Sequence, residues 1–105
     1  MKIAIRSKDG KTVSDSVTRF SGYLIYELKG EKVIGSEFRK CTSSFSEDQH
    51  FIGDCEAVIS KGISSDEKES LRKRGKEVLI TFKTSPEEAL RSFLKQRLLT
   101  GNFVH

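Results

Sequence analysis

The side chains that could bind a metal ion in this chain are few and widely spaced. The soft ligands are Cys41, His50 and Cys55, besides the terminal His105 and Met1. The intervals of nine and five residues between the first three match no closed zinc pattern. Thiolates are nevertheless the natural ligands of iron–sulfur clusters, and two from one subunit or four from a dimer are chemically sufficient. Cys41 and His50, both in a polar segment, are therefore candidate metal ligands.

Cys55 differs from these two because it precedes a compact apolar run at residues 56–60. A free cysteine at the start of a buried strand often behaves as a small hydrophobic residue. We therefore expect Cys55 to pack in the core, with metal binding as the less favoured alternative. His50, which precedes Phe51, also fits an ordinary solvated or hydrogen-bonded loop histidine.

A second candidate site is the turn between that apolar run and the charged segment that follows it. Backbone N–H groups and serine hydroxyls at the N-terminus of a helix attract anions, so a phosphate, a carboxylate or an anionic cluster would fit there. The candidate ligand-binding residues are Lys61, Gly62, Ser64, Ser65 and, from the loop before the second predicted strand, Arg19. One glycine does not make a nucleotide-binding fingerprint. An ordinary strand-to-helix turn with a capping serine remains the alternative.

Five strands are predicted to position these residues. Alternating or continuous runs of apolar, aromatic and β-branched residues lie at residues 2–6, 23–28, 33–38, 56–60 and 77–82. The second and third are separated by a glycine-containing turn at residues 29–32, which predicts an antiparallel hairpin.

Helices are predicted between and after the last two strands, and a short one over residues 48–53. Ser65 or Asp66 is expected to cap a helix that runs to Arg74, with Gly75 as its terminator. A final helix is expected to begin at Pro86, with residues 100–105 as a tail beyond its end. This order predicts a three-layer α/β domain in which the segment between residues 60 and 77 joins neighbouring parallel strands.

Composition indicates one folded domain over residues 1–105. Apolar residues make up 35% of the chain and charged residues 32%, and the apolar residues gather in short runs, which is typical of a chain with a core. No run approaches the roughly 20 apolar residues of a membrane-spanning helix, and the N-terminus lacks a signal segment. We therefore expect a cytoplasmic protein without membrane association and with free thiols. The net charge of +4 is spread along the chain, which makes nucleic acid an unlikely partner.

Two phrases, Lys2-Ile3-Ala4-Ile5 and Asp54-Cys55-Glu56-Ala57-Val58-Ile59, together with the order of elements, resemble the dinitrogenase iron-molybdenum cofactor family from end to end. The resemblance implies a ribonuclease-H-like fold with a five-stranded mixed sheet, the first three strands antiparallel and the last two parallel to strand one. It also implies a non-catalytic accessory protein that binds or carries an iron-sulfur or iron-molybdenum cluster. The partner of such an accessory protein would be a protein that donates or accepts the cluster.

The chain departs from the family pattern at the positions where relatives carry histidine. Residues 14–19 stand where the family often has Ser-Glu-His-Phe-Gly, and they match in the serine, the acid and Arg19 but lack the histidine, phenylalanine and glycine. The histidine-rich segment of many members is reduced here to Cys41 and His50. A metal-free interaction or regulatory domain, with a homodimer formed through an edge strand or the final helix, is therefore the alternative. A nuclease is disfavoured because strand one contains no acid.

Overall fold

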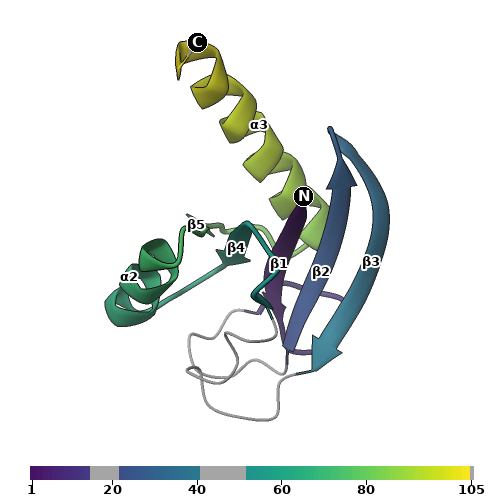
Figure 1. Ribbon diagram of the computed structural model, residues 1–105. Coiled ribbons are helices and arrows are strands. Elements are labelled where there is room, and N and C mark those ends of the chain that lie inside the picture. The colour runs from purple at the N-terminus through teal and green to yellow at the C-terminus, as the bar shows by residue number, and fades with distance from the viewer. Residues whose placement is uncertain (15–21, 41–51, 105) are drawn as a thin grey trace.

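The computed structural model describes residues 1–14, 22–40 and 52–104, with side chains up to residue 96. Its strands are β1 (Lys2–Ser7), β2 (Gly22–Lys29), β3 (Lys32–Lys40), β4 (Ala57–Ser60) and β5 (Glu77–Ile80), and its helices are α2 (Ser65–Lys73) and α3 (Pro86–Val104). The strands form one sheet in the order β3-β2-β1-β4-β5 (Figure 1). β1 and β2 pair antiparallel, as do β2 and β3, whereas β4 is parallel to both β1 and β5.

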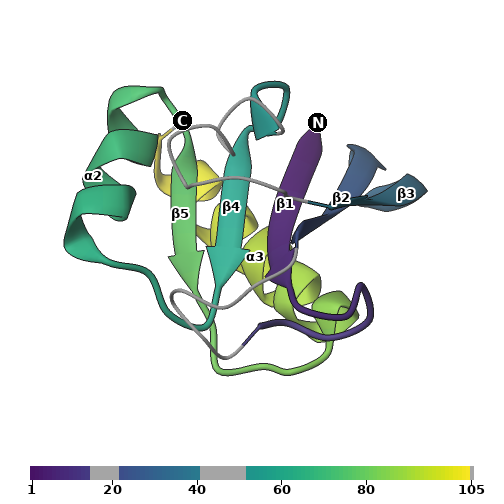
Figure 2. The ribbon, with the colours of Figure 1, turned by 90° about the horizontal axis from the view of Figure 1, so that it is seen from below.

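The predicted mixed sheet is therefore confirmed, with its antiparallel first three strands and its last two strands parallel to the first. The ribonuclease-H-like classification stays a prediction. Two hydrophobic clusters lie on opposite faces of the sheet. One contains Ile3 and Ile5 with Phe93 of α3, and the other contains Ala4 and Val58 with Leu71 of α2. We call these faces the α3 face and the α2 face. The two helices thus pack on opposite faces of the sheet, and α3 passes behind β4 and β1 in Figure 2.

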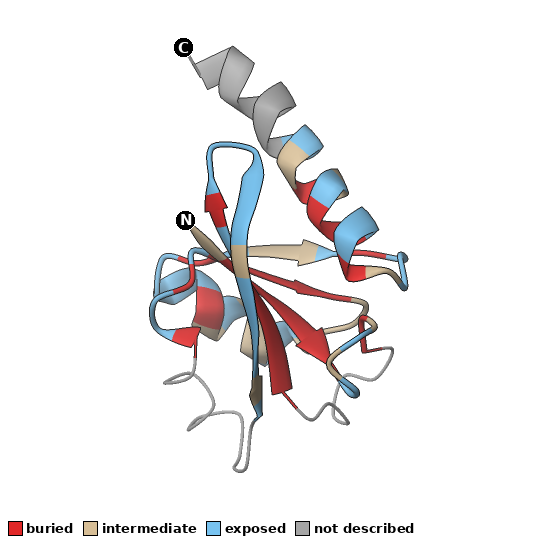
Figure 3. Ribbon diagram, turned by 90° about the vertical axis from the view of Figure 1, so that its right-hand side faces the viewer, coloured by how far each residue is buried: buried red, intermediate tan, exposed pale blue. Residues whose placement is uncertain are grey.

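Burial decreases from the centre of the sheet toward β3. All four residues of β4 are buried, as predicted for an apolar run that has a helix layer on each face. Most of β3 is exposed, as Figure 3 shows. The core therefore lies under the central strands, and the outer hairpin strand contributes little to it.

All five strands differ from their predicted bounds by one or two residues, and the differences of two residues are at the ends of β5 and β3. β5 ends at Ile80, although the apolar pattern continues to Phe82, because its neighbour β4 ends at Ser60 and Ser60 pairs with Ile80. β3 extends to Lys40 because β2 provides a partner as far as Gly22. The helix predicted over residues 48–53 lies largely outside the described residues.

The cap of α2 is Ser64, so the prediction of Ser65 or Asp66 was wrong by one or two residues. The Ser64 Oγ accepts a hydrogen bond from the Glu67 N–H, the arrangement that defines an N-cap. Gly75 follows the end of the helix with a φ of +79°, which confirms it as the left-handed terminator.

α3 begins at Pro86 as predicted, but it continues to Val104. The expectation of a non-helical tail from residue 100 was therefore wrong. Gly101 is the weakest helix former there, and one glycine costs a helix only about 1 kcal/mol relative to alanine, so it weakens the helix without ending it. In the described residues, no helix is long and apolar enough to cross a membrane.

Candidate functional site

The carboxyl ends of the parallel strands meet at one edge of the sheet. Near the end of β4, Ile59 pairs with Ile5 and Ser60 pairs with Ile80, and Ser7 at the end of β1 pairs with Gly22. Gly22 in turn pairs with Lys40, so the start of β2 and the end of β3 lie at the same edge. We call this region the carboxyl edge. Ligands of open α/β sheets bind at such edges.

Four of the predicted ligand-binding residues lie at the carboxyl edge. Lys61 and Gly62 directly follow β4, and Ser64 and Ser65 cap and begin α2. Arg19, Cys41 and His50 fall outside the described residues. Lys40, the residue before Cys41, ends β3 at this edge.

Arg6 is the charged residue at this edge that sequence reasoning missed. Its side chain is completely buried on the α2 face, and its Nη2 forms an ion pair with Glu67 in the first turn of α2. The pair joins the end of β1 to the start of α2. An arginine placed at an inward position of a buried strand was the available signal, because a buried charge needs a partner.

The turn after β4 uses part of its hydrogen-bonding capacity internally. The Ser60 Oγ donates to the Gly62 carbonyl over 2.6 Å and accepts the Gly62 N–H at 3.2 Å. The Lys61 Nζ donates to the Thr84 Oγ1 at 2.8 Å. Within the described residues, the amides of Ser65 and Asp66 have no acceptor, as is normal for the first turn of a helix. Those two amides, with the helix dipole, can attract an anion.

A hydrogen-bonded loop, residues 8–14, borders the carboxyl edge. The Asp9 carboxylate accepts hydrogen bonds from the backbone amides of Lys11 and Thr12, and these bonds lower its pKa to about 2. The Ser7 Oγ donates to the Thr12 carbonyl at 2.6 Å. The Ser14 N–H then donates to the Arg6 carbonyl, which returns the chain to the end of β1. The acid of this loop thus has a structural role.

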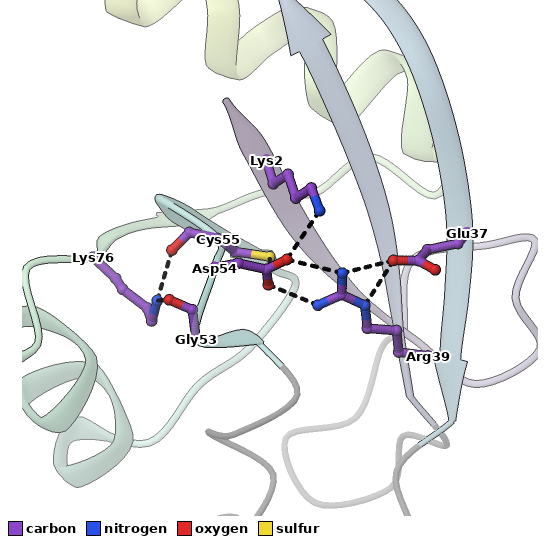
Figure 4. Close-up of polar contacts among 7 residues, drawn as sticks. All are labelled: Lys2, Glu37, Arg39, Gly53, Asp54, Cys55 and Lys76. Atoms are coloured by element: carbon purple, nitrogen blue, oxygen red, sulfur yellow. Dashed lines mark hydrogen bonds and ion pairs between the residues drawn. The ribbon is translucent and has the colours of Figure 1, made fainter.

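A second polar cluster lies on the α2 face and was also missed from the sequence (Figure 4). Arg39 forms two hydrogen bonds to the Asp54 carboxylate, at 2.7 and 3.0 Å, and its Nε donates to Glu37 at 2.8 Å. The Lys2 Nζ also donates to Asp54, at 3.0 Å. Hydrogen bonds from Arg39, above all, lower the pKa of Asp54, and Asp54 raises the pKa of Arg39 in turn. The cluster joins the end of β3, two residues before Cys41, to the residue before Cys55.

Cys55 itself is buried in the core of the α2 face, where it has an exposed fraction of 3%. Burial, followed by the nearby charge of Asp54, raises its pKa to about 11, so the thiol is protonated at neutral pH. Lys76 donates to the Cys55 carbonyl at 2.6 Å and to the Gly53 carbonyl at 3.4 Å (Figure 4). This environment is that of a packing residue, as expected. Among the described residues, no three histidine, cysteine or acidic side chains are grouped so that they could hold a metal ion.

A protein-family model and several solved structures match this chain. The family model for the dinitrogenase iron-molybdenum cofactor matches residues 1–96. The crystal structure of the protein PH0822 matches with a TM-score of 0.80 at 22% identity, over 91% of this chain and 90% of that one. A proposed dinitrogenase of Methanocaldococcus jannaschii matches with a TM-score of 0.75 at 18% identity, over 91% and 89% of the two chains. A proposed NifB protein from Thermotoga matches with a TM-score of 0.69 at 21% identity, over 91% and 89%. No curated protein is significantly similar in sequence.

Proposed function

The chain belongs to the dinitrogenase iron-molybdenum cofactor family, and from this membership and the geometry of the carboxyl edge we propose that it is a non-catalytic accessory protein that binds an anionic metal–sulfur cluster. The cluster would be cargo, received from or passed to a partner protein in the cytoplasm. The observation that carries the proposal is that Lys61 and the N-terminus of α2 follow each other at the carboxyl edge, where β3 also ends.

Electrostatics at this edge favour an anion. The amides of Ser65 and Asp66 begin a nine-residue helix, whose dipole places partial positive charge at that end. Lys61 adds a full positive charge, and the ion pair with Arg6 offsets the negative charge of Glu67. A cluster held by thiolates carries net negative charge, so it fits such a surface.

The protonation state of the Cys55 thiol makes other residues better candidates for metal ligands. A buried, protonated thiol does not fit a metal ligand, because the thiolate is the binding form. Cys41 and His50 therefore remain the candidate ligands in this proposal. Cys41 directly follows Lys40, which ends β3 at the carboxyl edge, with β2 and β1 between β3 and β4.

The arrangement of acids supports a protein without hydrolytic activity. Metal-assisted phosphoryl transfer needs several carboxylates that converge on paired metal ions. Here Asp9 accepts hydrogen bonds from backbone amides of its own loop, and Glu67 forms an ion pair with Arg6. Asp54 forms ion pairs with Arg39 and Lys2. Each of these acids thus serves a separate structural contact.

Anaerobic reconstitution with ferrous iron and sulfide tests the proposal, with zinc in a parallel sample. We expect stoichiometric iron and sulfide with visible absorbance in the wild type, loss of both in Cys41→Ser, and weaker retention in Lys61→Gln. Lys32→Gln removes an equal charge from the first residue of β3, away from the carboxyl edge, and serves as the matched control. Absence of specific iron uptake by the wild type would refute cluster binding.

A metal-free interaction domain is the second candidate function. It is favoured by the burial of Cys55 and by the absence of a metal-ligand group among the described residues. This function predicts that a partner protein is retained from native extract by the metal-free chain and by Cys41→Ser alike. Retention only after iron and sulfide loading would instead favour the cluster carrier.

A further inference from the structure

The segment between β5 and α3 brings Thr84 to the carboxyl edge. In Figure 2 this segment runs past the ends of β4 and β1 before α3 begins. The Thr84 carbonyl accepts a hydrogen bond from the Val13 N–H at 2.9 Å, and Val13 is buried in the cluster of the α3 face. The backbone at Thr84 is therefore anchored to the core, although the residue itself is exposed.

The side chain of Lys61 ends at this anchored residue. Its Nζ donates to the Thr84 Oγ1 at 2.8 Å, and the two residues are 23 positions apart in the chain. A lysine on a protein surface usually samples many rotamers, and a ligand that binds it must overcome the entropy lost when the side chain is fixed. The contact with Thr84 restricts Lys61 before a ligand binds, so its charge is already placed at the edge.

This contact leaves most of the ammonium group available. A lysine ammonium has three N–H donors and no acceptor, so the Thr84 oxygen is the acceptor and the bond uses one donor. Within the described residues, the other two donors of Lys61 are not used by a protein acceptor. They remain for an anion, while the bond to Thr84 sets where the charge lies.

We propose that Thr84 is a positioning residue of the anion site: it holds the Lys61 ammonium at the carboxyl edge and thereby raises the affinity of the site for an anionic metal–sulfur group. This inference rests on the function proposed above. Thr84→Val keeps the shape of the side chain but removes the acceptor, so Lys61 stays charged and loses its fixed position. Thr84→Ser keeps the acceptor and should preserve the affinity.

Anaerobic titration calorimetry with tetrathiomolybdate, a compact dianion of molybdenum and sulfide, tests the proposal. We expect Thr84→Val to bind this probe about fivefold more weakly than the wild type, the factor expected for one rotamer-rich side chain that must be immobilised on binding. Thr84→Ser should bind like the wild type. Lys61→Gln combined with Thr84→Val should bind no more weakly than Lys61→Gln alone, because Thr84 acts through Lys61.

Thr12→Val is the matched control, because it removes a hydroxyl from the same edge that donates to the Asp9 carboxylate at 3.1 Å. It should leave the affinity for tetrathiomolybdate unchanged, and circular dichroism verifies that each variant is folded.

Equal affinities of the wild type and Thr84→Val would overturn the positioning role and leave the proposed function standing. A further loss of affinity in the double variant would also overturn it, since Thr84 would then act independently of Lys61. A wild type that takes up iron and sulfide but does not bind tetrathiomolybdate would overturn the anion site at Lys61, and with it the role of Thr84, without refuting cluster binding. A wild type that takes up neither would overturn both proposals.

Discussion

Removing the carboxylate that faces Arg6 should destabilise the fold strongly. The Arg6 side chain is completely buried and that of Glu67 is 18% exposed. Removing one partner of a buried ion pair costs about 3 to 5 kcal/mol, because the remaining charge keeps its desolvation penalty. Water reaches part of Glu67, so we place Glu67→Gln at the lower end, about 3 kcal/mol. For a chain of 105 residues this corresponds to a melting temperature lower by roughly 14 °C.

Urea unfolding followed by far-ultraviolet circular dichroism measures this change, and Glu69→Gln is the matched control. Glu69 lies on the same helix, is 69% exposed and forms an ion pair with Lys73 at 3.6 Å. Exposed pairs of this kind contribute at most about 0.5 kcal/mol. Glu67→Gln should therefore be far less stable than Glu69→Gln.

A double variant checks the cause. When both members of a buried pair are replaced by apolar residues of similar volume, the loss is often small. Arg6→Met combined with Glu67→Met should therefore be more stable than Glu67→Gln alone. Differences in the free energy of unfolding below about 0.5 kcal/mol are within the usual error of such comparisons. If Glu67→Gln and Glu69→Gln differ by less than that, the buried pair does not hold α2 to β1.

Three further predictions follow from the burial, charge and backbone geometry of single residues. The folded-state pKa of Asp9 is about 2, below its ordinary 3.8, so its contribution to stability is present above pH 4 and is lost as the pH falls toward 2. In Asp9→Asn, the free energy of unfolding measured in urea should therefore depend less on pH between 4 and 2 than in the wild type. Cys55 should be alkylated at least ~100-fold more slowly in native protein than in urea, because its pKa is raised to about 11 in the fold. Mass spectrometry of the Cys41→Ser variant at about pH 8 measures both rates, and comparable rates would contradict the burial of Cys55. Gly22→Ala should lower the free energy of unfolding by about 2 kcal/mol or more, because a Cβ there would lie 2.2 Å from the Arg39 carbonyl oxygen; wild-type stability in thermal melts would disprove this contact.

Local patterns in the sequence determined most of the fold. The run at residues 56–60 predicted a strand buried on both faces, and all four residues of the observed strand, 57–60, are buried. Gly75 predicted the end of α2 and Pro86 the start of α3. These features depend on side-chain periodicity and on the backbone preferences of single residues, which neighbours along the chain reveal.

The candidate site was only partly readable in this way. The turn at Lys61, Gly62 and Ser64 was found because a strand, a glycine and a capping serine are adjacent in the sequence. The pairs Arg6–Glu67 and Arg39–Asp54 were missed, and their members are separated by 61 and 15 residues. The end of β5 was missed for a similar reason, because β4 sets it through pairing.

The sequence by itself determined which runs enter the core and, for the strands, their positions to within two residues, because apolar burial is non-directional and leaves a periodic pattern in the chain. Only the tertiary structure decided which buried charge meets which acid, and which strand is left at the edge. Polar contacts require two atoms to lie within about 3 Å of each other, and strand register and the position of the helices set that distance for residues far apart in the sequence.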